Sequence, residues 1–140
     1  MKLTVRRGLT VGAAAAATLA LAASPAFAGD VYARATGSQG WGEFYYNSRT
    51  SAYSITLAVQ DTAADGHHVR VRAQAEDPLR NISTYPWRSV TGGYGVKGSW
   101  ATSLTDSRGI WAMRIQVCTF EGDTPLSCDT SPWDGNPYYG

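Results

Sequence analysis

The segment SITLAVQDTAADGHHVRVRAQ, residues 54–74, decides the fold class of this chain. In its first half, apolar residues alternate with small or polar ones from Ile55 to Val59, and the second half repeats the alternation. A period of two places the apolar side chains on one side of a β-strand. Between the halves stands Asp65-Gly66, a pair that tolerates the positive φ of a tight turn. The segment therefore predicts a β-hairpin.

Other parts of the chain carry the same strand signal. The clearest is Ile110–Cys118, where apolar and polar residues again alternate. The residues predicted to face the core there are Trp111, Met113, Ile115 and Val117. Further aromatic or β-branched segments predict strands over Val31–Ala35, Trp41–Tyr46 and Tyr94–Thr102.

The remaining pattern indicates an all-β domain. Asp77–Arg88 contains two prolines and is predicted to be a long surface loop. Glycine and proline are scattered through the chain after residue 28, and no long window there has helical periodicity. Six or seven short strands separated by turn signals favour an antiparallel β-sandwich, with an open β-barrel as the alternative.

The first 28 residues have the features of an export signal. Three basic residues near the start precede the apolar run Val11–Ala23, and Ala26-Phe27-Ala28 fits a cleavage site. We therefore expect residues 1–28 to be a signal peptide and residues 29–140 to be a single secreted, extracellular domain. The pair Arg6-Arg7 leaves a twin-arginine route open, although the general secretory route is favoured.

Charge and hydropathy restrict the partners. Removing Lys2, Arg6 and Arg7 leaves nine basic residues against 11 acidic ones, a net charge near −2. No basic patch of the kind that binds nucleic acid is present in the sequence, and no apolar or amphipathic segment after residue 28 predicts membrane association. We expect a monomer that binds neither nucleic acid nor membrane.

The chain has two cysteines, Cys118 and Cys128. Export to an oxidising compartment and their even number predict a disulfide between them. Closing a loop of about 11 residues stabilises the folded state by roughly 2.5–3 kcal/mol. The bond is expected to pin the loop Thr119–Ser127 against the preceding strand. Two cysteines alone do not make a zinc site.

The two histidines, His67 and His68, lie close in sequence to Asp61 and Asp65. A catalytic base oriented by a carboxylate is one interpretation, and it would make the protein a small hydrolase. However, adjacent strand residues point to opposite faces, and Asp at a turn commonly accepts hydrogen bonds from its own backbone. Common nucleophile motifs are absent from the sequence. A structural role is therefore favoured for all four residues.

Carboxylates offer two further interpretations. Glu43 with Glu76 or Glu121 could form a glycosidase pair, although any domain of this size contains such pairs. Calcium is a second possibility, and the acidic residues of the C-terminal part that it would use are Glu121, Asp123, Asp129 and Asp134. Neither these nor Asp61 and Asp65 follow the spacing of an EF-hand loop. We expect a noncatalytic protein without metal or cofactor.

Aromatic residues give the best indication of binding. Several lie in predicted loops, where the strand pattern does not require their burial. The candidate ligand-binding residues are Tyr85, Trp87, Trp133, Tyr138 and Tyr139. Exposed aromatic rings on a β-sandwich suit stacking against sugar rings or contact with a peptide. The alternative is that they cover the ends of the sandwich and stiffen its loops.

Three features of the chain resemble a group of short, uncharacterised secreted proteins of actinobacteria. They are the alanine-rich leader, the segment Asp61-Thr62-Ala63-Ala64-Asp65-Gly66-His67, and a late strand that ends in Cys118 with Cys128 after it. The resemblance implies secretion and a small β domain, and it brings no catalytic residues.

The sequence thus predicts a secreted noncatalytic protein that binds extracellular carbohydrate or cell-wall polymer through loop and tail aromatics. The alternative is an inhibitor of an extracellular protease, which would insert the segment Asp77–Arg88 into its target. A small secreted hydrolase is a third hypothesis.

Overall fold

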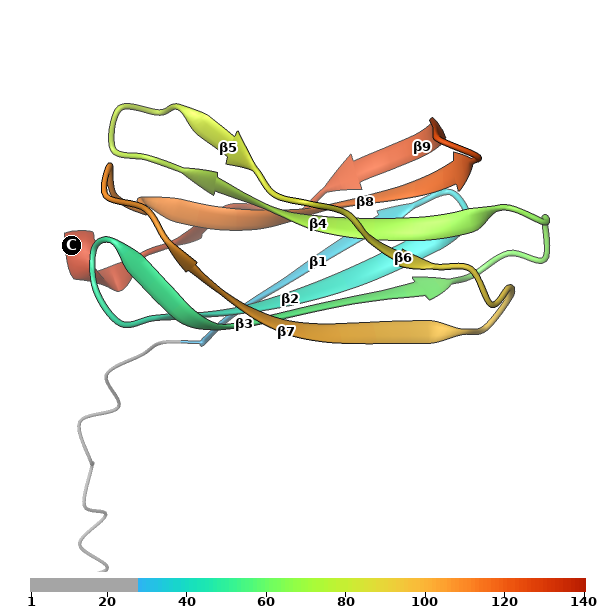
Figure 1. The fold of residues 1–140 in the computed structure, drawn as a ribbon, viewed down its shortest axis with the longest axis horizontal. Coiled ribbons are helices and arrows are strands. Elements are labelled where there is room, and N and C mark those ends of the chain that lie inside the picture. Colours follow the sequence, from blue (N-terminus) through green and yellow to red (C-terminus); the bar gives the residue numbers. More distant parts are fainter. Residues whose placement is uncertain (1–27) are drawn as a thin grey trace, which may run out of the picture.

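The computed structural model describes residues 28–140, which form two antiparallel β-sheets packed face to face (Figure 1). The predicted β-sandwich is confirmed, and the sheets do not close into a barrel. The predicted signal peptide, up to residue 27, lies outside the described residues. No helix within the described range is long and apolar enough to span a membrane.

Seven strands of seven or more residues, together with three shorter ones, build the two layers. The first sheet has the order β1 (Ala28–Ala35), β2 (Ser38–Tyr46), β3 (Ser51–Asp61) and β7 (Lys97–Thr105). The second sheet has the order β10 (Asp134–Gly135), β8 (Ala112–Glu121), β4 (His68–Glu76) and β5 (Ile82–Thr84). In addition, β6 (Arg88–Val90) pairs with β4, and β9 (Thr124–Thr130) pairs with β8. A short 3-10 helix, η1 (Pro137–Tyr139), follows β10.

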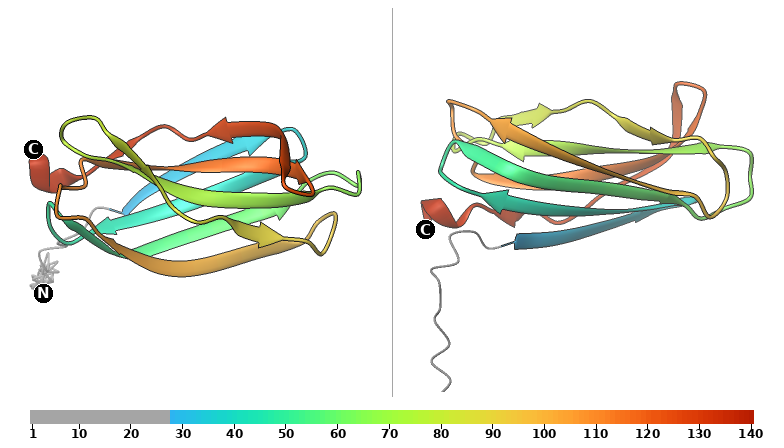
Figure 2. Two further views of the ribbon diagram at one scale, coloured as in Figure 1. Left: turned by 45° about the horizontal axis from the view of Figure 1, so that its top comes forward. Right: turned by 60° about the horizontal axis from the view of Figure 1, so that its bottom comes forward.

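The hairpin predicted from residues 54–74 is wrong, because its two strands belong to different sheets. β3 pairs with β2 and β7, whereas β4 pairs with β5, β6 and β8. Gly66 has the expected positive φ of 75°, and the backbone N–H of His67 donates to Asp65 Oδ1 over 3.0 Å. The local turn chemistry is therefore as predicted, but the turn lies in a link that crosses between the layers (Figure 2).

Asp61 organises this crossing at the end of β3. It is only 1% exposed, and its Oδ1 accepts a hydrogen bond from the backbone N–H of Ala63 over 3.1 Å. Its own backbone N–H donates to Val96 O, and Gly95 N–H donates to Asp61 O. A buried carboxylate whose partners are backbone groups fixes the chain at this corner.

The two sheets pack tightly where β2 crosses β8. A Cβ on Gly40 would lie 2.3 Å from Val117 Cγ2, and one on Gly42 would lie 2.7 Å from Ile115 Cγ2. Glycine is therefore required in β2 by the opposite sheet. The largest fully buried side chains between the sheets are Tyr46, Phe44, Ile55, Ile110, Met113 and Ile115.

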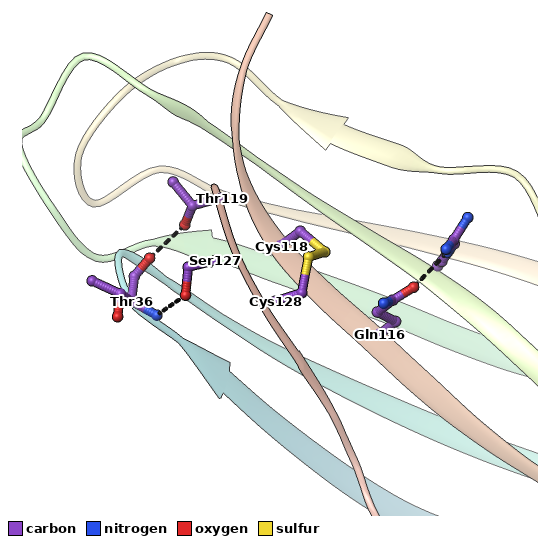
Figure 3. Close-up of a disulfide and its surroundings, with 7 residues drawn as sticks. Thr36, Gln116, Cys118, Thr119, Ser127 and Cys128 are labelled. Atoms are coloured by element: carbon purple, nitrogen blue, oxygen red, sulfur yellow. Dashed lines mark hydrogen bonds between the residues drawn. A yellow bond between two sulfur atoms is a disulfide. The ribbon is translucent and has the colours of Figure 1, made fainter. Parts of the chain in front are cut away.

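The predicted disulfide is present, joining directly opposed residues of β8 and β9 (Figure 3). The segment Thr119–Ser127, predicted as a loop, is largely the hairpin of these two strands, with Gly122 at positive φ in its turn. The hairpin also reaches the other sheet, because Thr36 N–H donates to Ser127 Oγ over 3.0 Å.

Two other sequence predictions need correction. Asp77–Arg88 is not one continuous surface loop, because it contains β5 and its last residue begins β6. Trp111 precedes β8 and is only half-buried; its ring contacts Tyr139 and the Arg80 guanidinium instead of facing the core.

The glycine contact between the sheets generates a stability prediction. Gly40→Ala should lower the free energy of unfolding by about 1–3 kcal/mol, because the added methyl overlaps Val117. Urea unfolding of the variant measures this. Gly135→Ala is the matched control, since nothing lies within 4 Å of its Cβ position. Equal stabilities of the two variants would contradict the packing argument.

Candidate ligand-binding face

The outer face of the second sheet has a polar centre built by β4 and β8. Arg72 lies opposite Gln116 in the strand register, and Gln74 lies opposite Arg114. Arg72 Nε donates to Gln116 Oε1 over 2.7 Å, and Arg114 Nε donates to Gln74 Oε1 over 2.8 Å. These four residues are named here the Arg–Gln quartet. They form two cross-strand pairs: in one the arginine is on β4 and the glutamine on β8, and in the other the arginine is on β8 and the glutamine on β4. Planar donor and acceptor groups are thereby fixed at the centre of the face.

A tryptophan ring packs on each arginine of the quartet. The Arg72 guanidinium carbon lies 4.1 Å from the centre of the Trp87 ring, and that of Arg114 lies 4.2 Å from the Trp133 ring. Both indoles are half-exposed. Burial lowers the pKa of Arg72 from its ordinary value, the direction expected for a partly covered cation.

The two tryptophans enter the face from opposite sides. Trp87 lies between β5 and β6, which pair with β4, whereas Trp133 lies between β9 and β10, which pair with β8. The sandwich therefore places two residues far apart in sequence on either side of the Arg–Gln quartet.

Trp87 is held by a second contact. Its ring meets the ring of Phe120 edge-on, with centroids 5.2 Å apart. Phe120 is buried under Arg70, whose guanidinium carbon lies 4.1 Å from the phenyl centroid and whose Nη2 pairs with Asp123 over 2.9 Å. These contacts restrict the orientation of the indole.

The three tyrosines predicted as ligand-binding residues lie elsewhere. Tyr85 packs against the core and lines an apolar crevice of about 80 Å³ between β7 and the β5–β6 connection. Burial raises the pKa of its hydroxyl. Tyr138 and Tyr139 belong to η1 at one end of the sandwich (Figure 1), where the Tyr139 hydroxyl donates to Arg49 O over 3.1 Å. Of the five predicted residues, only Trp87 and Trp133 flank the Arg–Gln quartet.

The histidines do not form the arrangement with Asp61 that the hydrolase hypothesis requires. His67 Nδ1 pairs with Glu121, and His68 Nε2 accepts a hydrogen bond from Arg70 Nε over 2.9 Å. Because the Asp61 carboxylate is buried and bonded to backbone, it does not orient a catalytic base.

The acidic residues considered as a glycosidase pair lie on different sheets, because Glu43 belongs to β2, Glu76 to β4 and Glu121 to β8. Glu43 is exposed on the first sheet, whereas Glu76 is buried on the second and pairs with Arg80 over 2.9 Å. Across residues 28–140, no group of three or more His, Cys, Asp or Glu side chains is placed to hold a metal ion.

Sequence reasoning missed the Arg–Gln quartet. Its residues are visible as long polar side chains at alternate positions of two strands, but their pairing depends on the β4–β8 register. The sequence pattern predicts that β4 pairs with β3, so it gives no indication of the register between β4 and β8.

The stacked pair generates a second prediction. A double-mutant cycle of Arg72→Ala and Trp87→Ala should give a favourable coupling of about 0.5–1 kcal/mol in urea unfolding, as expected for a partly exposed cation–π contact. Arg88, which is exposed and lies next to Trp87, supplies the control cycle and should couple to it by less than about 0.3 kcal/mol. Additive effects in both cycles would show that the Arg72 contact does not hold the ring.

Comparison with known proteins identified no relative of this chain. No protein-family model, curated protein or solved structure matches the chain. The function is therefore argued from the arrangement of side chains alone.

Proposed function

We propose that this is a secreted, noncatalytic protein that binds an extracellular polysaccharide on the outer face of its second sheet. The observation that carries the proposal is the placement of Trp87 and Trp133 on either side of the Arg–Gln quartet. The disulfide between Cys118 and Cys128 supports the extracellular location, because such bonds persist in oxidising compartments.

The chemistry of this face suits a sugar chain. The apolar face of a pyranose ring stacks on an indole, and sugar hydroxyls need planar hydrogen-bonding groups nearby. Each indole packs on a guanidinium and is half-exposed, which leaves ring surface for a ligand. Because the quartet uses Nε of both arginines internally, their terminal Nη groups are the donors a ligand would meet. Two cations at the centre favour an acidic polymer.

The proposal predicts selective retention on insoluble polysaccharide. Protein secreted from the full chain would be incubated with cellulose, chitin, xylan and peptidoglycan, and the bound fraction measured at low and high salt. Trp87→Ala and Trp133→Ala should each weaken binding about tenfold or more, the loss typical of a buried aromatic contact. Retention on an acidic polymer should fall with salt.

Tyr53→Ala is the matched control, because Tyr53 is 61% exposed on β3 of the other sheet. It should bind as the unmodified protein does. Retention on none of the polymers, or retention unaffected by either tryptophan variant, would contradict this function.

Inhibition of an extracellular protease is a second candidate function, supported by one turn. Leu79 is 84% exposed, and its backbone N–H donates to Asp77 Oδ1, which also accepts from Asn81 N–H. Arg80 beside it has a φ of 72°. A fixed turn that presents an apolar side chain lowers the entropic cost of entering a protease pocket.

This second candidate predicts 1:1 inhibition of a secreted protease with an apolar specificity pocket. Leu79→Asp should abolish inhibition, whereas Leu126→Asp, a change of another exposed leucine on β9, should leave it intact. Residual activity of chymotrypsin-like and subtilisin-like proteases at micromolar protein measures it. Full protease activity throughout would exclude this role.

A further inference from the structure

Asp134 carries a buried charge-bearing atom without a partner. Its Oδ2 and Ser38 Oγ are the two buried side-chain polar atoms without a hydrogen bond in the described part of the chain. The Tyr46 hydroxyl donates to the backbone O of Asp134 over 2.7 Å. An ionised carboxylate is costly to bury when no donor or cation meets it.

The groups that shift the pKa of Asp134 include no cation. Burial raises the pKa of its carboxyl group, hydrogen bonding with the Tyr46 hydroxyl lowers it, and the neighbouring carboxylate of Asp30 raises it. The buried Tyr46 is the other titratable group that interacts with it. Of these groups none is positively charged, so an ionised Asp134 has no cationic partner among them.

Gly29 lies directly against this carboxylate. A Cβ placed on Gly29 would lie 1.9 Å from Asp134 Cγ and 2.0 Å from each carboxylate oxygen. The nitrogen and the Cβ position of one residue are about 2.5 Å apart, so the Gly29 nitrogen lies within about 4.5 Å of both oxygens. In the uncleaved chain this nitrogen is a neutral amide.

We propose that hydrolysis of the Ala28–Gly29 peptide bond completes the site, and that the new α-ammonium group of Gly29 becomes the ion-pair partner of Asp134. A signal peptidase adds water across the bond, so Ala28 leaves with a carboxylate and Gly29 keeps a protonated amine. The inference uses the cleavage site predicted from the sequence and is independent of the proposed polysaccharide binding. It makes Asp134 the receptor for the mature N-terminus, which joins β1 to β10.

Cleavage then inverts the way in which the contribution of Asp134 to stability depends on pH. Before cleavage the raised pKa of Asp134 means that its contribution to stability is greatest at low pH and is lost as pH rises through that pKa. After cleavage the ammonium group lowers the Asp134 pKa, and the carboxylate in turn raises the pKa of the amine. The pair then stabilises the fold between the ordinary carboxyl range, about 4, and the ordinary amine range, about 8.

The test begins with the full chain expressed in a secreting bacterial host. The mass of the secreted protein should correspond to an N-terminus at Gly29, and any other N-terminus would overturn the proposal. The pKa of the α-amine, measured by NMR, should lie about one unit above the ordinary value of about 7.7–8.0. An ordinary value would also overturn it, and this measurement needs no variant.

Acetylation of the α-amine then tests the energetic coupling. The work uses a Lys97→Arg background, because Lys97 is the one lysine after residue 28. Acetylation should reduce the folded-to-unfolded ratio about tenfold, because one pKa unit corresponds to a factor of ten. When Asp134→Asn is also present, acetylation should reduce this ratio less than about twofold. Asp123→Asn is the control, since that carboxylate is exposed and pairs with Arg70. Equal losses in the Asp134→Asn and Asp123→Asn proteins would refute the pairing.

Discussion

The close approach of β2 to β8 is the constraint on which the rest of the structure depends. Gly40 and Gly42 bring the two layers into contact at Val117 and Ile115, and a side chain at either glycine would push them apart. β8 is thereby fixed over the first sheet while it also carries β4, β9 and β10. Side chains of successive strand residues point to opposite faces of the sheet. Because Ile115 faces the core, the neighbouring Arg114 points to the outer face, where it packs against the Trp133 ring.

Strands and their buried faces could be predicted from the sequence, because alternation is a local property. The alternate apolar residues of two strands are buried as their patterns indicated: Ile55, Leu57, Val59, Met113, Ile115 and Val117. Which strands pair with each other could not be predicted in the same way. The pair Asp65-Gly66 forms the same kind of turn whether the flanking strands pair in a hairpin or belong to different sheets. The sequence could not distinguish these cases, because the decision rests on the β4–β8 pairing, whose partners are about 40 residues apart.

The candidate site likewise combines residues that the sequence reveals with residues that only the strand pairing reveals. Trp87 and Trp133 could be recognised as aromatic residues in irregular segments, but the arginines beneath them required the strand register. Tyr85 comes from the same segment as Trp87, yet it packs against the core. The sequence alone does not separate the two, since burial in an irregular segment is set by tertiary packing and not by a repeating pattern.

The link between the β8–β9 hairpin and the first sheet bears on how copies of this domain behave toward one another. β1 and β7 are the two edges of the first sheet, and an unpaired edge can add a strand from another molecule. At the end of β1, the backbone N–H groups of Arg34 and of Thr36, just after the strand, already donate to the side chains of Asp129 and Ser127 of β9. By holding β9 in place, the disulfide helps to keep this end of β1 covered, so that β7 is the more open edge of the first sheet.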